Sequence, residues 1–227
     1  MRSEFEKVVT LLNDSELDYW VDAGSLLGII RDGHLLDSDP DIDFATWFEE
    51  KDNILRFLEV LKDSGFETSK KLYDGQLYGC TAKPLHTKKY ERKIDIHVLQ
   101  RNSEYAWSPS KHLLKNNFNS PDPRYFLLGF PRYLFDKASS EFDEIDFSNI
   151  PWRYIHEFRT FIVPIDLVEN SIIHSQFGVP IPHKAQEYLE YRYGNWQTPV
   201  SDWDWWEDDN AIVNTNPRAF QRQRLDQ

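Results

Sequence analysis

Two aspartates on either side of one isoleucine, Asp41 and Asp43, are the residues best placed for chemistry in this chain. On a strand, alternate side chains share a face, so both carboxylates point the same way while Ile42 points into the core. Carboxylates that converge repel one another unless a cation lies between them, and oxygen-only ligation suits Mg²⁺ or Mn²⁺. The pair therefore predicts a divalent metal site, with an acidic surface turn as the alternative.

A glycine-serine turn, Gly24-Ser25, precedes this pair and should open a helix. Free backbone N–H groups at a helix N-terminus form an anion site, and glycine lets a phosphate approach the backbone closely. Arg31 follows two helical turns after Gly24, near the same face, where its guanidinium could clamp a phosphate. The alternative for Arg31 is a solvated residue at a helix end. Together with the acidic pair, the turn predicts metal-dependent phosphoryl or nucleotidyl transfer.

A third acid, Asp95, lies in an alternating segment in which His97 shares its face. If this segment lies beside a strand over residues 41–46, Asp95 joins the pair, and three carboxylates can hold two metal ions. A solvated strand face is the alternative for Asp95. His97 could orient a ligand or the acceptor hydroxyl, or it could be a hydrogen-bonded strand histidine without a role in chemistry.

Hydrophobic spacing and turn signals predict the elements that position these residues. Helices are expected over residues 3–14, 24–31, 49–63, about 166–176 and 184–193. Strands are expected over residues 17–21, 41–46, 66–73, 76–81, 94–99 and 161–163. Residues 103–152 are rich in aromatics and proline and give little regular pattern, and the tail after Asn210 is expected to fray. Strands mixed with helices predict an α/β or α+β fold, a mixed β-sheet flanked by helices.

The composition excludes several classes of protein. The net charge of −12 argues against a nucleic-acid or anionic-membrane partner, because such binding needs clustered Lys and Arg. Cys80 is the only cysteine, which excludes an intrachain disulfide and a cysteine-cluster zinc site. No window is apolar enough to predict a transmembrane segment, and residues 1–10 lack the apolar centre of a signal peptide. A cytoplasmic location is the simplest expectation.

Two segments resemble the LicD family, which includes bacterial phosphocholine transferases and the ribitol-phosphate transferases fukutin and fukutin-related protein. They are residues 22–43, DAGSLLGIIRDGHLLDSDPDID, and residues 188–199, YLEYRYGNWQTP. They occur in the family's order and bracket most of the chain. The resemblance implies a nucleotidyltransferase-like fold over residues 1–200, with an aromatic-rich helical part near its C-terminal end. It also implies transfer of a phospho-alcohol, such as phosphocholine or ribitol phosphate, from a CDP-linked donor to a sugar hydroxyl of a glycan, for instance a cell-surface polysaccharide.

By this resemblance Gly24 and Ser25 fall on the turn that binds the donor phosphate. Asp41 and Asp43 take the metal positions, and Asp95 is the third acid. The chain departs from the family pattern just before the acids: Asp37-Ser38 stands where the family commonly has Pro-Trp, and Pro40 separates two of the acids. Asp39 lies in this altered loop and is a candidate for substrate binding. The resemblance leaves the conformation of the loop open.

Two other functions fit the same residues. One is a nucleotidyltransferase that moves a nucleoside monophosphate from an NTP onto a small acceptor, with pyrophosphate as the leaving group. The other is a carbohydrate-binding protein without catalysis. Residues 201–227 are expected to form a tryptophan-rich acidic segment and polar tail that packs on the preceding domain or extends from it. Its aromatic side chains could grip a sugar, or they could pin the segment onto the core.

Overall fold

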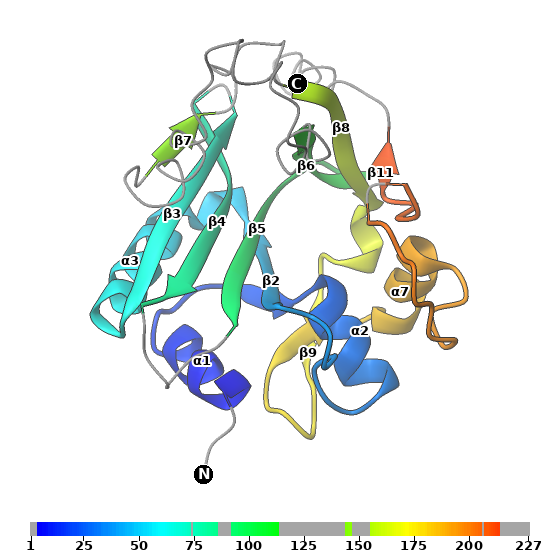
Figure 1. Ribbon diagram of the computed structural model, residues 1–227, viewed down its shortest axis with the longest axis horizontal. Helices are drawn as coiled ribbons and strands as arrows, with labels where there is room; N and C mark the ends of the chain where they lie inside the picture. The colour runs from blue at the N-terminus through cyan, green and yellow to red at the C-terminus, as the bar shows by residue number, and fades with distance from the viewer. Residues whose placement is uncertain are drawn as a thin grey trace, which may run out of the picture.

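The computed structural model describes residues 4–73, 75–85, 92–113, 144–146, 155–205 and 207–213. Within these residues a mixed β-sheet is flanked by helices, which confirms the predicted fold class (Figure 1). The helices are α1 (Glu4–Asn13), α2 (Ala23–Arg31), α3 (Lys51–Asp63) and α7 (Ala185–Tyr193), with short 3-10 helices η1 (Phe48–Glu50) and η4 (Ile165–Leu167). No helix in the described part of the chain is long and apolar enough to cross a membrane.

The described strands form one large sheet and one small hairpin. They are β1 (Tyr19–Val21), β2 (Asp41–Trp47), β3 (Phe66–Tyr73), β4 (Gln76–Pro84), β5 (Lys93–Arg101), β6 (Tyr105–Leu113), β7 (Glu144–Asp146), β8 (Ile155–Pro164), β9 (Ser171–Ile173), β10 (Pro180–Pro182) and β11 (Ile212–Val213). The large sheet runs β11-β8-β6-β5-β4-β3-β7, and β2 joins it as a parallel neighbour of β5. Strand β1 pairs with β2, and β9 with β10.

Strand β5 stands at the centre of this arrangement. Its first seven residues pair with β2, and residues 94–97 also pair with β4 on the other side. Its last two residues, Gln100 and Arg101, turn to pair with β6. The expected neighbourhood of the strands around residues 41–46 and 94–99 is therefore confirmed, and the pairing is parallel.

One face of the central strands forms the main core. Ile42 and Phe44 on β2 and Ile94 and Ile96 on β5 are buried there, and the ring of Phe5 on α1 stacks on Phe44 with centroids 6.3 Å apart. Helix α3 covers the sheet at β3 and β4 and contacts α1. Its buried residues follow the predicted spacing: Ile54, Phe57, Leu58 and Leu61. The opposite face of β2 and β5 remains for polar side chains.

The predicted helix from Asp166 to Gln176 is wrong. Only residues 165–167 form a turn of 3-10 helix, and Ser171–Ile173 is strand β9 in a hairpin with β10. The backbone N–H of His174 donates to the carbonyl of Val179 and closes this hairpin. The run Ser171-Ile172-Ile173 carries two β-branched isoleucines, and an available partner strand decides in favour of extended structure.

Strand β6 is a second difference, because residues 105–113 gave no regular pattern in the sequence. Pro109 faces Thr160 of β8, while β5 pairs only with Ala106 and Trp107 of β6. Proline is tolerated here because it stands beyond the two residues that pair with β5. Strand β8 is longer than the predicted residues 161–163, and Ile212–Val213 pairs with it. The rest of the expected frayed tail, residues 214–227, and residues 114–143 and 147–154 lie outside the described residues.

Candidate metal and phosphate site

Three aspartates meet on the polar face of the central strands. Asp41 and Asp43 lie on β2, and Asp95 lies on β5 directly opposite Asp43. One carboxylate oxygen from each lies within 4.8 Å of the others. Asp43 and Asp95 are buried, and Asp41 is partly exposed. The parallel register therefore brings together the three acids that the sequence proposed as metal ligands.

Asp95 is held by three donors, Lys93 on its own strand, Thr81 on β4 and Lys71 on β3. The hydroxyl of Thr81 donates to Oδ1 at 2.6 Å, Lys93 Nζ lies 2.6 Å from Oδ2, and Lys71 Nζ lies 3.5 Å from Oδ1. Burial alone would raise the pKa of Asp95, but Lys71, Lys93 and Thr81 hold that pKa well below its usual range. Asp95 is therefore an ionised carboxylate with a fixed orientation.

The pKa of Asp43 is shifted in the opposite direction to that of Asp95. Burial raises the pKa of Asp43 to about 8, and the negative charges of Asp39, Asp41 and Asp95 act in the same direction against His97. Burial and Asp41 also raise the pKa of Asp39. Both carboxyl groups would ionise more easily beside a cation.

The donor set fits a divalent cation. All three groups offer oxygen, which is the ligand type that Mg²⁺ and Mn²⁺ prefer. A positive group already stands between two of them: Lys93 Nζ lies 2.5 Å from Asp41 Oδ2 and 2.6 Å from Asp95 Oδ2. Asp41, Asp43 and Asp95 are therefore the residues that would hold the ion.

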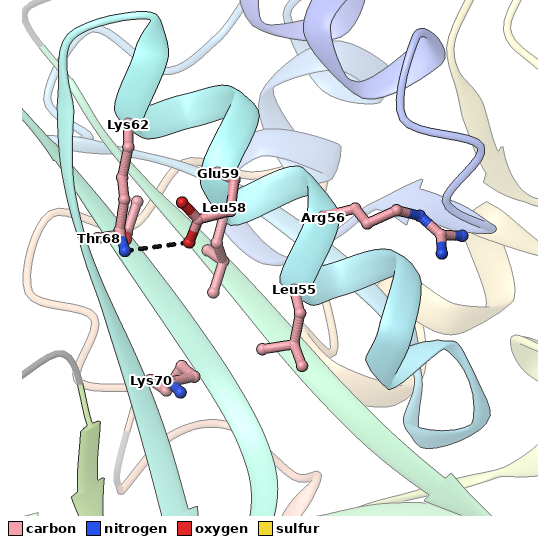
Figure 2. Close-up of a pocket in the computed structure, with 7 residues that line it drawn as sticks. All are labelled: Leu55, Arg56, Leu58, Glu59, Lys62, Thr68 and Lys70. Atoms are coloured by element: carbon pink, nitrogen blue, oxygen red, sulfur yellow. Dashed lines mark hydrogen bonds and ion pairs between the residues drawn. The ribbon is translucent and has the colours of Figure 1, made fainter.

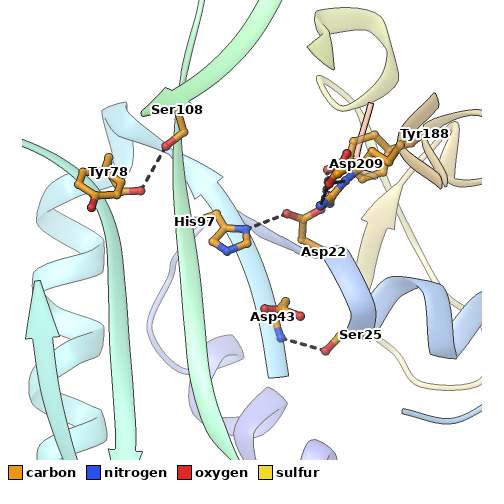
Figure 3. Close-up of polar contacts among 9 residues, drawn as sticks. Asp22, Ser25, Asp43, Tyr78, His97, Ser108, Tyr188 and Asp209 are labelled. Carbon is orange, nitrogen blue, oxygen red and sulfur yellow. Dashed lines mark hydrogen bonds and ion pairs between the residues drawn. The ribbon is translucent and has the colours of Figure 1, made fainter. Parts of the chain in front are cut away.

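The start of helix α2 is joined to β2 beside these acids (Figure 3). The backbone N–H of Asp43 donates to Ser25 Oγ at 2.9 Å, and the N–H of Asp22 donates to the carbonyl of Asp43 at 3.1 Å. The Ser25 hydroxyl thus fixes the strand next to the helix terminus. Asp22 precedes the helix with extended backbone angles, and its side chain caps no helical N–H.

Gly24 makes room for a carboxylate at this terminus. A Cβ atom on Gly24 would lie 2.1 Å from Asp39 Oδ2 and 3.7 Å from Asp43 Oδ2. The position that the sequence assigned to a donor phosphate is thus bordered by Asp39, which approaches the glycine backbone directly. Only a residue without a side chain allows this approach.

Gly24→Ala is expected to displace Asp39 and to lower donor turnover by about tenfold while changing the free energy of unfolding little, because a flexible carboxylate can move away. Gly28→Ala is the matched control. Its Cβ would lie 2.6 Å from the carbonyl oxygen of His34, a backbone atom, so it should destabilise the fold by about 1–3 kcal/mol. Denaturant unfolding and turnover of both variants test this contrast, and equal unfolding curves would contradict it.

A hydrogen-bonded network, buried except for the partly exposed His97, connects the site to the C-terminal part of the chain (Figure 3). His97 Nδ1 lies 3.1 Å from Asp22 Oδ2. Asp22 Oδ1 accepts from the Tyr188 hydroxyl at 2.6 Å and from Arg192 Nη1 at 3.2 Å. Arg192 in turn donates through Nε and Nη2 to Asp209 Oδ2 at 3.0 and 2.7 Å. We call these five residues the Asp22 network.

Oppositely charged side chains are paired within the Asp22 network: Arg192 lies between Asp22 and Asp209, and His97 contacts Asp22. Burial alone would raise the pKa of Asp22, but Arg192, His97 and Tyr188 hold it well below its usual range. Burial would lower the pKa of His97, yet its contact with Asp22 raises that pKa above the ordinary value. The sequence singled out His97 but assigned no role to Asp22, Arg192 or Asp209. The signal that the sequence offered was Arg192 itself, which lies four residues after Tyr188 and between two tyrosines of the predicted helix.

Arg31 and the tryptophan-rich segment, the other candidates from the sequence, contact residues other than the three acids. The Arg31 guanidinium binds both carboxylate oxygens of the adjacent Asp32 at 2.9 Å. The ring of Trp203 packs on Tyr193 with centroids 4.9 Å apart, and Trp205 is exposed. Trp206 lies outside the described residues.

A surface hollow of about 450 Å³ lies between α3 and β3 (Figure 2). It is lined by Leu55, Arg56, Leu58, Glu59, Lys62, Thr68 and Lys70. Thr68 and Lys70 alternate along β3 with Lys71, whose ammonium reaches Asp95. The hollow is therefore on the opposite face of the sheet from the three acids and does not contribute to their site.

Comparison with known proteins places the acids inside a recognised domain. The model of the family described as LicD/FKTN/FKRP, nucleotidyltransferase domain, matches residues 16–130. No curated protein matches the chain. The matched range contains the start of α2, the paired acids of β2 and Asp95, whereas Tyr188, Arg192 and Asp209 lie beyond it.

Proposed function

The chain belongs to the LicD/FKTN/FKRP nucleotidyltransferase-domain family, and from this premise we propose that it transfers a phospho-alcohol group from a CDP-linked donor to a sugar hydroxyl of a glycan. Family membership indicates a transferase that acts on sugars or glycans. The observation that carries the proposal is the convergence of Asp41, Asp43 and Asp95 beside the start of α2.

In the proposed reaction the acceptor hydroxyl attacks the distal phosphorus of the donor in line, and CMP leaves. A divalent cation held by Asp41, Asp43 and Asp95 would neutralise phosphate charge and acidify the attacking hydroxyl. Positioning and charge stabilisation account for most of the rate in such transfers. Lys71 and Lys93 add positive charge on the same face. The start of α2 contributes its positive dipole end.

The proton of the attacking hydroxyl is assigned to Asp43 rather than to Asp95. Asp95 already accepts from Thr81 and Lys93, and its depressed pKa makes it a weak base. Asp43 has a raised pKa in the metal-free protein, and its Oδ2 lies on the side of Gly24, beside Asp39. A bound cation would lower that pKa, so Asp43 would accept the proton as a weaker base than its metal-free pKa implies.

The direct test is to incubate the protein with Mg²⁺, mixed sugar acceptors and either CDP-choline, CDP-ribitol, CDP-glycerol or the four NTPs. Release of CMP from a CDP-alcohol supports the proposal. Release of pyrophosphate from an NTP would instead identify a nucleotidyltransferase. Glycan binding that EDTA leaves unchanged, without turnover of any donor, would identify a carbohydrate-binding protein.

The raised pKa of Asp43 predicts how the metal changes stability with pH. Between the ordinary aspartate pKa of 3.8 and about 8, the folded protein keeps a proton that the unfolded chain has lost. The free energy of unfolding of the metal-free protein should therefore fall as pH rises through this range, by up to about 1.4 kcal/mol per unit. Mg²⁺ replaces that proton, so the increase in Tm caused by Mg²⁺ should grow toward pH 8.

Melting curves in EDTA and in Mg²⁺ across this range measure the effect. Asp43→Asn is the control, because it removes one of the two acids with a raised pKa and should reduce the pH dependence to the part that Asp39 contributes. An increase in Tm that is the same at acidic and mildly alkaline pH would contradict the prediction.

A further inference from the structure

Lys93 is bound between two of the three acids rather than extended into solvent. It is the first residue of β5 and stands opposite Asp41 in the parallel register. Its Nζ lies 2.5 Å from Asp41 Oδ2 and 2.6 Å from Asp95 Oδ2. The ammonium thus joins carboxylates from two strands, at a site where 35% of its own side chain remains exposed.

This position overlaps with the one that a cation bound by the acids would take. The Oδ2 atoms that face Lys93 belong to two of the three groups able to ligate an ion together. A divalent ion and an ammonium repel each other strongly at such separations. This repulsion makes it unfavourable for both to occupy the same two oxygens, so binding of the ion disfavours the present position of Lys93.

Lys71 makes a different contact with the same site. Its Nζ approaches the other oxygen of Asp95, Oδ1, at the longer distance of 3.5 Å. Thr81 also donates to that oxygen. Lys71 can therefore remain in place when Asp95 Oδ2 is occupied by an ion, and it supplies a matched lysine for comparison.

We propose that Lys93 exchanges partners during binding: its ammonium neutralises Asp41 and Asp95 until a divalent ion displaces it, and it then binds a phosphate of the donor. The inference rests on the proposed function, because it uses the same metal site and an anionic donor. The lysine stem is flexible and tethered at the edge of the site, so the displaced charge stays near any phosphate that enters. The exchange makes metal binding favour donor binding.

A lysine that merely stabilises the strands predicts a different result. If Lys93 were only a structural partner of the acids, its removal would loosen Asp41 and Asp95 and weaken metal binding. If it competes with the metal, its removal leaves two carboxylates without their counter-charge, and these bind a divalent ion more tightly. The direction of the change in metal affinity therefore separates the two roles.

The experiment compares Lys93→Met, Lys93→Arg and Lys71→Met with the wild-type protein. Calorimetric titration with Mg²⁺ alone, without donor, should show roughly tenfold tighter binding to Lys93→Met and a smaller change in Lys71→Met. Lys93→Arg keeps the charge and should stay near wild type. Titration with CDP at saturating Mg²⁺ should then show roughly tenfold weaker binding to Lys93→Met, because the displaced ammonium is missing. Melting curves confirm that each variant is folded.

Unchanged or weaker Mg²⁺ binding in Lys93→Met would overturn the exchange. Tighter Mg²⁺ binding with unchanged CDP binding would overturn the second part of the proposal, in which the displaced Lys93 binds a phosphate of the donor. Asp41→Asn separates this failure from failure of the proposed function. If the wild type binds Mg²⁺ and Asp41→Asn does not, the metal site stands whatever Lys93 does. If neither the wild type nor Lys93→Met binds Mg²⁺, the metal site and the exchange fall together.

Discussion

Asp43→Asn is expected to reduce transfer from the CDP-linked donor by at least about a hundredfold while the protein stays folded. The substitution keeps the shape of the side chain but removes the charge that would ligate the ion and accept the proton. Because burial and three neighbouring carboxylates disfavour the ionised form of Asp43, the metal-free variant should match the wild type in stability near pH 4 and exceed it increasingly as pH rises toward 8. Loss of activity without loss of stability distinguishes a functional carboxylate from a structural one.

CMP release and melting curves of the same preparation test this expectation. Asp37→Asn is the matched control, since Asp37 precedes the acids by a few residues and is exposed. It should change neither activity nor the response to Mg²⁺. Activity of Asp43→Asn within about tenfold of wild type would rule out the proposed role of this carboxylate.

Arg192→Met should lower the free energy of unfolding by about 3–5 kcal/mol. The guanidinium is 7% exposed and binds Asp22, which is fully buried, and Asp209, which is 2% exposed. Removing it leaves two buried carboxylates without their shared counter-charge, and that loss is much larger than the net value of the ion pair itself. Since the pKa of Asp22 is depressed in the folded protein, this stability is present above the ordinary aspartate range and is lost as pH falls below it.

Denaturant unfolding at neutral pH measures the loss. Lys184→Met provides the comparison at the other end of the same helix, because Lys184 pairs with Asp166 at the surface and its removal should change stability little. A loss below about 1 kcal/mol in Arg192→Met would show that the network does not hold the C-terminal part of the chain in place.

The sequence predicted the acidic site better than it predicted the surroundings of the site. Alternation along residues 41–46 and 94–99 sets which side chains share a face, so the face of Asp41, Asp43 and Asp95 could be read directly. The contact of Lys93 with Asp41 could not, because it depends on a register between strands that are about fifty residues apart in the chain. Arg192 and Asp22 are separated by 170 residues, beyond the range of any local pattern.

The errors in secondary structure have the same origin. Residues 171–173 are a strand because β10 pairs with them, and residues 105–113 are a strand because β8 does. Local propensity favoured a helix in the first case, and the proline in the second case obscured the strand. In both, hydrogen bonds to a distant partner decided the outcome.

The Asp22 network can be completed only late in the synthesis of the chain, because two of its members lie near the C-terminal end. The ribosome releases the N-terminal part first, so all three acids emerge long before Arg192 and Asp209 do. Until those two residues arrive, Asp22 lacks the counter-charge that permits its burial. A polypeptide that stops near residue 180 would thus carry all three acids and still lack the arginine that neutralises Asp22 beside the start of α2.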